Sequence, residues 1–347
     1  MNQPKLLTPD NWKDYQLIDS GGGEKLERFG AYVVARPEPQ ALWDKSFPES
    51  EWIKADAAFG RGDALRNNDV RRGGRPDSPG ATRGDSRNDE RGEWVCRPGM
   101  EQQWWIEYAY KEMRLKLRLG LTSFKHVGLF PEQAENWNYL YDNLRLMAGR
   151  LGRAPRVLNL FAYTGGATLA ARAAGAEVTH LDSVKQVVTW ARENMEHSGL
   201  DGVRWIVDDA AKFVRKEISR GKKYDAIILD PPAYGRGPDG EKWVLEQDIN
   251  GLLKGCAQLL ERENALLLLN LYSMGLSALL AKGLANQLFG TPGKPEADQA
   301  PGQSATNQTP GQPKSNHAPE NEEFGELYVE DRSGKALPLG IYYRFVR

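Results

Sequence analysis

The fold is decided by residues 156–234, and within them by the run Val157-Leu-Asn-Leu-Phe-Ala-Tyr-Thr-Gly-Gly166. A short apolar segment leads into a turn of small residues with paired glycines, and then into the helix-forming segment 167–174. This pattern is typical of a buried parallel strand that is followed by a turn and a helix. Glycine suits the turn because the backbone there approaches a ligand and can adopt φ > 0, while the first helical amides face an anion. A tight turn without a ligand would also use paired glycines, so the glycines alone do not indicate a binding site. The strands that follow in the sequence give further evidence.

Three more strand predictions follow, and each strand ends on an acid: Asp182, Asp209 and Asp230. The first two are followed by helical patterns over 184–197 and 210–218. Strands that alternate with helices predict an α/β fold with a doubly wound parallel sheet, whose carboxyl strand ends form one crevice. An acid that ends the second strand, about 20 residues beyond a glycine turn, suits a ribose diol.

These residues resemble the class I S-adenosylmethionine-dependent methyltransferases. The glycine turn differs from the dinucleotide pattern Gly-x-Gly-x-x-Gly, and Asp230-Pro-Pro-Ala-Tyr234 is typical of the nucleobase-modifying branch. With the upstream Gly-x-Phe-x-x-Gln at 128–133, the chain resembles the bacterial 23S rRNA large-subunit methyltransferases within that branch. The resemblance covers nearly the whole chain outside two insertions. It implies a seven-stranded Rossmann-like sheet completed by an antiparallel C-terminal pair.

The resemblance also implies S-adenosyl-L-methionine as the cofactor. Residues of the glycine turn are expected at its methionine end, Asp182 at the ribose and Asp209 at the adenine. The full predicted cofactor set is Phe130, Gln133, Asn159, Phe161, Ala162, Tyr163, Gly165, Gly166, Asp182, Ser183, Asp209 and Asp230.

Asp230, Pro231 and Tyr234 are predicted to face the acceptor. The carboxylate and the Pro231 carbonyl offer two hydrogen-bond acceptors to an exocyclic amine, and Tyr234 offers a face for a flipped base. Methyl transfer from a sulfonium is an in-line displacement, so the protein mainly binds and orients. Cytosine C5 methylation needs an attacking cysteine. The segments where related enzymes carry one hold other residues here: Ala233, Tyr234, Leu271, Tyr272 and Ser273.

Residues 1–124 are predicted to form a small β-rich domain, and residues 125–347 the methyltransferase domain. Hairpins are expected over 15–30 and over 103–119, with a further strand that Pro37 ends. The aromatic residues of the second hairpin could stack on exposed bases or fill a small core, and both interpretations stay open. They are Trp104, Trp105, Tyr108 and Tyr110.

Two insertions, 61–92 and 291–322, are almost devoid of apolar side chains. They cannot bury enough surface to offset the entropy of ordering, so both are predicted to be disordered. The first contains arginines that could hold RNA phosphates, but acids interleave with them.

The composition limits the function further. A formal net charge of -1 over 347 residues gives no global basic field, so RNA, the expected substrate, would need a local patch. The two cysteines form neither a metal-spaced cluster nor a disulfide framework, and Cys256 falls at an apolar helical spacing. No signal peptide, membrane span or metal site is expected, which favours the cytoplasm. The oligomeric state stays open.

Three alternatives remain. A methyltransferase acting on a protein or a small molecule fits the near-neutral charge. An NAD-dependent oxidoreductase would use a similar sheet, but the dinucleotide glycine pattern is missing. A non-catalytic RNA-binding protein could retain the fold.

Overall fold

The computed structural model describes residues 3–10, 12–60, 92–272, 275–289 and 321–347. The predicted disordered insertions lie outside the described residues, except for residue 92 of the first and residues 321–322 of the second. Within the described ranges, no helix is long and apolar enough to cross a membrane.

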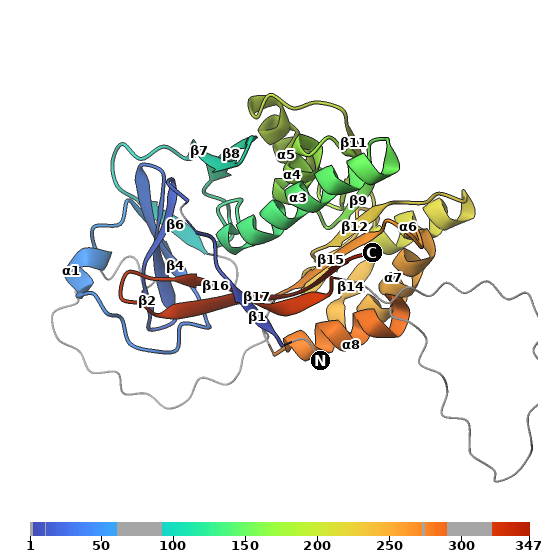
Figure 1. Cartoon of the computed structure of the whole chain (residues 1–347). Helices are drawn as coiled ribbons and strands as arrows, with labels where there is room; N and C mark the ends of the chain where they lie inside the picture. The colour runs from blue at the N-terminus through green and yellow to red at the C-terminus, as the bar shows by residue number, and fades with distance from the viewer. Residues whose placement is uncertain (1–2, 11, 61–91, 273–274, 290–320) are drawn as a thin grey trace, which may run out of the picture.

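The centre of the molecule is an eight-stranded mixed sheet in the order β1-β16-β17-β15-β12-β9-β10-β11 (Figure 1). Only β17 runs antiparallel to its neighbours. In chain order the strands are β1 (Lys5–Leu7), β9 (Arg156–Leu160), β10 (Glu177–Asp182), β11 (Val203–Val207), β12 (Ala226–Leu229), β15 (Leu266–Leu271), β16 (Glu323–Glu330) and β17 (Ala336–Val346). The predicted strands of the glycine-turn region and the C-terminal antiparallel pair are thus confirmed.

The expected count of seven strands does not include β1, which adds to the sheet beside β16. Gly325 makes this pairing possible, because a Cβ at that position would lie 1.7 Å from the carbonyl oxygen of Lys5. The added strand covers the backbone groups that β16 would otherwise expose at the edge.

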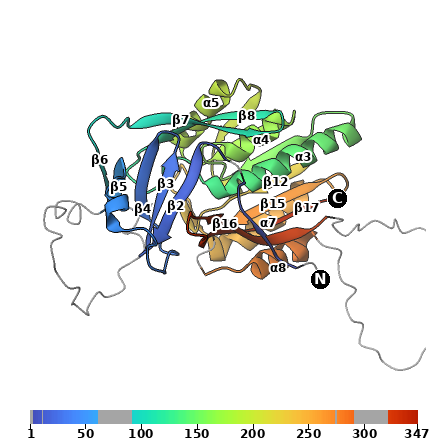
Figure 2. The same cartoon turned by 60° about the vertical axis from the view of Figure 1, so that its left-hand side comes forward.

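Helices pack on both faces of this sheet (Figures 1 and 2). Alternate strand residues enter two separate apolar cores: Val157 and Ile228 face one, while Leu158 and Ile227 face the other. One face carries α3 (Ala134–Leu151), α4 (Gly166–Ala173) and α5 (Lys185–His197), and the other carries α6 (Ala210–Ser219), α7 (Leu245–Leu259) and α8 (Ala278–Phe289). Burial on both faces explains why the central strands read as unbroken apolar runs.

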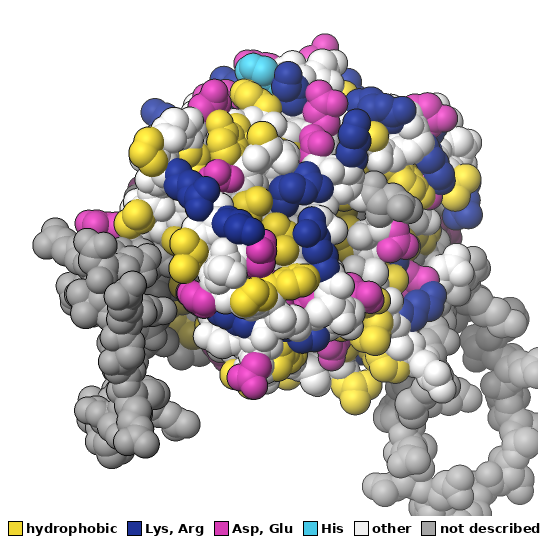
Figure 3. Space-filling model, turned by 90° about the vertical axis from the view of Figure 1, so that its left-hand side faces the viewer, with side chains coloured by type: hydrophobic (Ala, Val, Ile, Leu, Met, Phe, Trp, Pro, Cys, Tyr) yellow, Lys and Arg dark blue, Asp and Glu magenta, His cyan; other side chains and the backbone are white. Residues whose placement is uncertain are grey.

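A second sheet of five strands, β2-β3-β4-β5-β6, forms the N-terminal part, with the short helix α1 (Glu49–Trp52) beside it. The predicted hairpin and third strand are confirmed. On this side of the molecule, Lys and Arg side chains lie among Asp and Glu side chains, so both signs of charge occur on the surface (Figure 3). The strands are β2 (Tyr15–Gly21), β3 (Glu24–Phe29), β4 (Tyr32–Pro37), β5 (Ala57–Gly60) and β6 (Glu93–Cys96).

The hairpin of β7 (Gln103–Tyr110) and β8 (Met113–Gly120) forms a sheet of its own. It packs on α4 and α5, and the backbone N–H of Arg118 donates to Asn194 Oδ1 at 2.8 Å. Trp104 and Tyr108 are each only 5% exposed, so for these two side chains the core interpretation holds. Trp105 instead stacks on His197, with ring centroids 4.0 Å apart. The domain boundary at residue 124 stays a prediction.

Candidate cofactor and acceptor site

The turn between β9 and α4 has an unusual backbone. Phe161 and Tyr163 adopt left-handed φ angles of 56° and 49°, and Gly165 has φ 93°. Such conformations cost roughly 1–3 kcal/mol for residues other than glycine, and they persist where the surroundings fix them. Strain of this kind is common at ligand-binding turns.

Asp182, at the end of β10, fixes this turn. Its Oδ2 accepts a hydrogen bond from the backbone N–H of Tyr163, and its Oδ1 accepts one from Val184, both at 3.0 Å. Burial raises the pKa of the carboxyl, while the N–H groups of Val184, Tyr163 and Ser183 lower it. A carboxylate held by the backbone at a strand end suits the two hydroxyl donors of a ribose.

The two glycines of the turn make room for neighbouring side chains. A Cβ on Gly166 would lie 2.4 Å from the ring of Trp137, and one on Gly165 would lie 3.0 Å from Ala191 Cβ. Trp137 lies on α3, four residues beyond Gln133, so helical spacing could have indicated it. The glycine pattern is therefore explained in part by packing against this tryptophan.

A cavity opens between this turn, the start of α3 and the end of β12. It brings together nine of the predicted residues: Phe130, Gln133, Asn159, Phe161, Ala162, Tyr163, Gly165, Gly166 and Asp230. Six further lining residues were not predicted: Leu129, Trp137, Thr164, Ala167, Ile228 and Leu268. Asp182, Ser183 and Asp209 do not line it.

Two predicted cofactor residues have structural partners of their own. Asp209 is the N-cap of α6, and its Oδ1 accepts from the backbone N–H of Lys212 at 2.8 Å. Asn159 Nδ2 donates to Thr168 Oγ1 at 2.9 Å, and that hydroxyl contacts His180 Nδ1 at the same distance. Burial lowers the pKa of His180 to about 3, so this chain of buried groups is neutral.

Aromatic rings join the predicted upstream segment to the turn. The ring of Phe130 lies 5.5 Å from that of Tyr163 and 5.2 Å from that of His126. Burial lowers the pKa of His126 to about 3, so this side chain is neutral. Gln133, in the short 3-10 turn η2 (Pro131–Gln133) before α3, accepts from Asn136 Nδ2 at 2.9 Å.

Asp230 follows β12 at the same edge of the sheet. Burial raises its pKa to about 6, and a hydrogen bond of 2.6 Å from Asn270 Nδ2 to its Oδ1 lowers it. Its Oδ2 accepts no hydrogen bond from the described part of the chain. Asn270 was not predicted, because only the pairing of β12 with β15 brings it here.

The backbone carbonyl groups that follow Asp230 differ in whether they accept a hydrogen bond. The Pro232 carbonyl accepts from Trp243 Nε1 at 2.7 Å, and the Ala233 carbonyl accepts from the Leu245 N–H at 3.0 Å. Among the described residues, no donor reaches the Pro231 carbonyl. Tyr234 lies on the short hairpin of β13 (Tyr234–Arg236) and β14 (Lys242–Val244), and 39% of it is exposed.

The N-terminal sheet reaches the same edge. Tyr272, just beyond β15, donates to Glu38 Oε1 at 3.4 Å, and Lys25 pairs with Glu38 at 3.1 Å. Both charged residues are nearly fully buried. The β domain is therefore in contact with the segment that follows Asn270.

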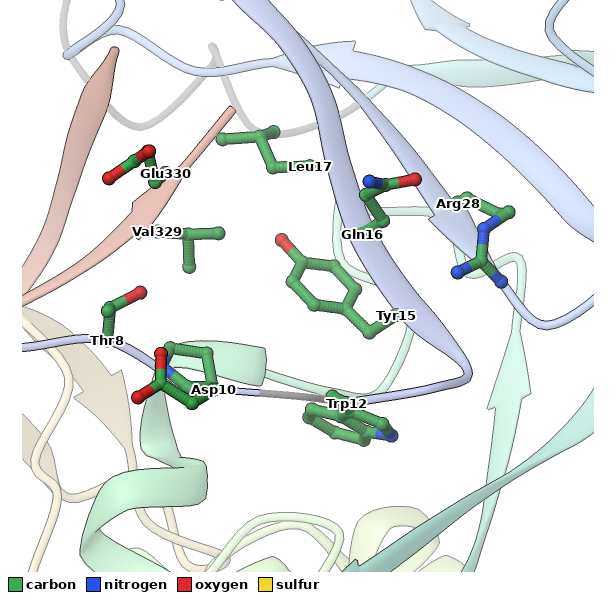
Figure 4. Close-up of a pocket in the computed structure, with 10 residues that line it drawn as sticks. Thr8, Asp10, Trp12, Tyr15, Gln16, Leu17, Arg28, Val329 and Glu330 are labelled. Atoms are coloured by element: carbon green, nitrogen blue, oxygen red, sulfur yellow. The ribbon is translucent and has the colours of Figure 1, made fainter. Parts of the chain in front are cut away.

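A larger cleft of about 420 Å³ lies elsewhere, between the N-terminal segment, β2 and the end of β16 (Figure 4). It contains none of the predicted site residues. Arg28 at its rim is held by the carbonyl groups of Gly30 and Lys13, and Tyr15 donates to Glu27. Its residues are Thr8, Pro9, Asp10, Trp12, Tyr15, Gln16, Leu17, Arg28, Val329 and Glu330.

No group of three or more His, Cys, Asp or Glu side chains in the described ranges is arranged to hold a metal ion.

Comparison with known proteins gives matches over the whole fold. A family model described as S-adenosylmethionine-dependent methyltransferase matches residues 82–286. The crystal structure of a SAM-dependent methyltransferase from Agrobacterium tumefaciens is 31% identical, with a TM-score of 0.76 over 99% of this chain and 94% of that one.

Two curated relatives are named as ribosomal RNA enzymes. The chain is 30% identical over 186 residues to ribosomal RNA large subunit methyltransferase K/L of Shewanella frigidimarina, covering 52% of this chain and 25% of the relative. It is 32% identical over 126 residues to ribosomal RNA large subunit methyltransferase I of Klebsiella pneumoniae, covering 35% and 30%. The chain thus spans less than a third of the length of either relative.

Proposed function

Because the chain belongs to the S-adenosylmethionine-dependent methyltransferases, we propose that it methylates an amino nitrogen of a nucleobase in RNA, most directly ribosomal RNA. The cofactor is S-adenosylmethionine, which supplies an electrophilic methyl group on its sulfonium. Transfer is a direct in-line displacement without a cysteine nucleophile: the amine nitrogen bonds to the methyl carbon as the carbon–sulfur bond breaks, S-adenosylhomocysteine leaves, and the methylated amine gives up one proton to solvent. The chain's own residues bind the donor, orient the amine and exclude water.

The cofactor-binding residues are proposed to be those predicted from the sequence, with Trp137 and Thr164 added. Left-handed Phe161 and Tyr163 support the methionine end, Asp182 the ribose diol, and Asp209 the adenine. Asp182 and Asp209 both lie at the carboxyl ends of neighbouring strands, β10 and β11. From this edge of the sheet, both residues can contact the cofactor although they do not line the cavity itself.

The observation that carries the acceptor proposal is a pair of free oxygens. Asp230 Oδ2 and the Pro231 carbonyl lie on consecutive residues and accept no hydrogen bond from the described residues, whereas the next two carbonyls are engaged. Two adjacent acceptors suit an amino group with two N–H donors. Tyr234 offers a partly exposed ring for stacking of the base, which is typically worth ~1–3 kcal/mol.

The cysteines support the direct mechanism. Cys256 lies on the buried face of α7, and burial raises its pKa to about 12. A thiol held in this state is a poor nucleophile. Cys96 lies on β6 in the N-terminal sheet.

The RNA acceptor is supported by the names of the two curated relatives and by the appended β domain. We propose that residues 1–124 help to choose the acceptor and that residues 125–347 carry the catalytic site. The contact of Tyr272 with Glu38 fits this division of labour, because it joins the β domain to the acceptor edge.

The test is transfer of a radiolabelled methyl group from S-adenosylmethionine by the purified protein, with rRNA, tRNA, total protein and a metabolite extract offered in parallel. Label that ribonuclease removes, followed by identification of an N-methylated base after digestion to nucleosides, is expected. Asp230→Ala provides the matched control and should abolish incorporation. Label found only in protein or metabolites would refute the RNA proposal and favour the alternative acceptor classes, which the net charge of -1 fits.

A further inference from the structure

Strand β15 carries one residue that its packing does not call for. Its sequence is Leu-Leu-Leu-Leu-Asn-Leu, and it is buried along its whole length. Asn270, the single polar side chain of the strand, is only 4% exposed. A strand covered on both faces is best filled by apolar side chains, and a buried amide is unfavourable unless it is hydrogen-bonded.

The register of the sheet gives this amide its partner. In the parallel pairing of β12 with β15, Leu229 lies opposite Leu269, so Asp230 and Asn270 come next on the two strands. Asn270 Nδ2 donates to Asp230 Oδ1 at 2.6 Å, a short hydrogen bond of the kind that an ionised acceptor forms. The buried Oδ1 of Asn270 accepts no hydrogen bond from the described residues. Packing alone would not favour an asparagine here, which leaves the contact with Asp230 as its role.

We propose that Asn270 is a positioning residue of the acceptor site. Its amide occupies one oxygen of Asp230 and leaves the other free, so that the carboxylate presents a single acceptor in a fixed orientation. Together with the Pro231 carbonyl, this arrangement selects an amino group that donates two hydrogen bonds. The inference rests on the proposed role of Asp230 in binding the amine.

The electrostatic surroundings make Asn270 the group that controls Asp230. Burial and the Asn270 hydrogen bond are the two causes that shift the pKa of Asp230, and no charged side chain in the described part of the chain contributes. The titratable side chains on the adjoining segments include Tyr163 on the glycine turn and Tyr272 beyond β15. Burial raises the pKa of both, so both are neutral. Removing the amide donor therefore leaves burial unopposed.

The primary test follows the ionisation of Asp230 and needs no acceptor. In protein labelled with ¹³C-aspartate, the Asp230 carboxyl resonance is identified by its absence from Asp230→Asn and is followed over pH in wild type, Asn270→Ala and Asn270→Asp. We expect an upward shift of the midpoint by about one pH unit in Asn270→Ala, because the donor that favours the charged form is gone. Asn270→Asp, of equal size, should shift it further, since two adjacent carboxyls share one proton.

Asn286→Ala is the matched control. It removes an amide on α8 that accepts from Tyr343 at 3.0 Å, and it should leave the Asp230 midpoint unchanged. If Asn270→Ala fails to fold, Asn270→Leu decides the question, because it also removes the amide donor and continues the leucine run of β15. An Asp230 midpoint equal to that of the wild type in the folded variant without the donor would overturn the proposal.

The second readout separates this inference from the proposed function. With RNA as the methyl acceptor, Asn270→Ala should lower kcat tenfold or more, leave KM for S-adenosylmethionine unchanged, and shift the acidic limb of the rate profile with the Asp230 midpoint. A shifted midpoint in a protein that methylates no RNA would support the positioning role and refute the RNA acceptor. RNA methylation with unchanged kcat and pH profile in Asn270→Ala would support the RNA acceptor and refute the positioning role of Asn270.

Discussion

The side chain of Asp182 and the backbone N–H of Tyr163 are joined by a hydrogen bond of 3.0 Å, which ties the end of β10 to the turn that follows β9. The other carboxylate oxygen accepts from Val184 N–H at the same distance. Since Tyr163 has a left-handed φ of 49°, the acid proposed for the ribose also fixes a strained turn. One carboxylate therefore fixes the turn and is also proposed to bind the cofactor.

Replacing this carboxylate should weaken cofactor binding. Asp182→Ala removes the proposed ribose acceptor and the partner of the Tyr163 amide. A hydrogen bond to a charged group contributes about 1.5–3 kcal/mol, so affinity for S-adenosylmethionine should fall roughly 10- to 100-fold. Isothermal titration calorimetry measures the change directly.

The control for this variant is Asp201→Ala, in which an exposed carboxylate paired with Arg172 is removed. Its affinity should equal that of the wild type. Wild-type affinity in Asp182→Ala itself would show that the ribose assignment is wrong.

Gly166→Ala should destabilise the fold. The added methyl group would lie 2.4 Å from the ring of Trp137, and overpacking of this kind typically costs ~1–3 kcal/mol. Urea denaturation, followed by tryptophan fluorescence, gives the free energy of unfolding of the variant and the wild type.

Gly149→Ala on α3 is the matched comparison, because a Cβ there would meet no atom of the described residues within 4 Å. It should leave stability equal or raise it by up to about 1 kcal/mol, given the helix propensity of alanine. Equal stability of Gly166→Ala and the wild type would contradict the packing explanation for the second glycine.

The sequence predicts the strands around the glycine turn because each carries a local signal: an apolar run, a turn and a helical period. It does not predict β1. The three residues of β1 are too few to show a hydrophobic periodicity. Their pairing depends on Gly325, which is far away in the sequence. Asn270 is missed for a related reason, since one polar residue in a run of leucines acquires its meaning only from the register with β12.

The second hairpin illustrates the same limit. Alternation places Trp104 and Tyr108 on one face of β7, but it cannot say what covers that face. In the structure Tyr108 packs against Trp137 of α3, with ring centroids 5.5 Å apart. Trp105, on the opposite face, is left half-buried against His197. Which aromatic side chains are available to a ligand is thus decided by tertiary packing.

Methyl transfer should depend on the ionisation of Asp230. Burial raises its pKa to about 6, and protonation would place a proton on Oδ2, the oxygen that is proposed to accept the amine N–H because Oδ1 is engaged by Asn270. At saturating S-adenosylmethionine, the rate should be level above neutral pH and fall about tenfold per pH unit below pH 6. Initial rates between pH 5 and pH 8 test this, and a flat profile would exclude Asp230 as the ionising group.

The same pKa shift predicts a change in stability. A carboxyl whose pKa is raised in the folded state stabilises the fold while it is protonated, and this contribution is lost as the pH rises through the folded pKa. Relative to Asp230→Asn, the wild type should therefore lose stability between about pH 4 and pH 6 and stay level above. Thermal unfolding of both proteins across this range gives the difference, and parallel curves would contradict the raised pKa.

Cys256→Ala tests the proposal that no cysteine attacks the acceptor. The thiol is fully buried and its pKa is raised to about 12, so we expect the variant to keep at least half of the wild-type methylation rate. The lost packing should cost about 1 kcal/mol of stability. A thiol reagent should label Cys96 in the native protein and reach Cys256 only after unfolding, because the side chain of Cys96 is partly exposed. Loss of methylation in Cys256→Ala, with cofactor affinity and fold intact, would show instead that a covalent intermediate on this thiol is part of the reaction.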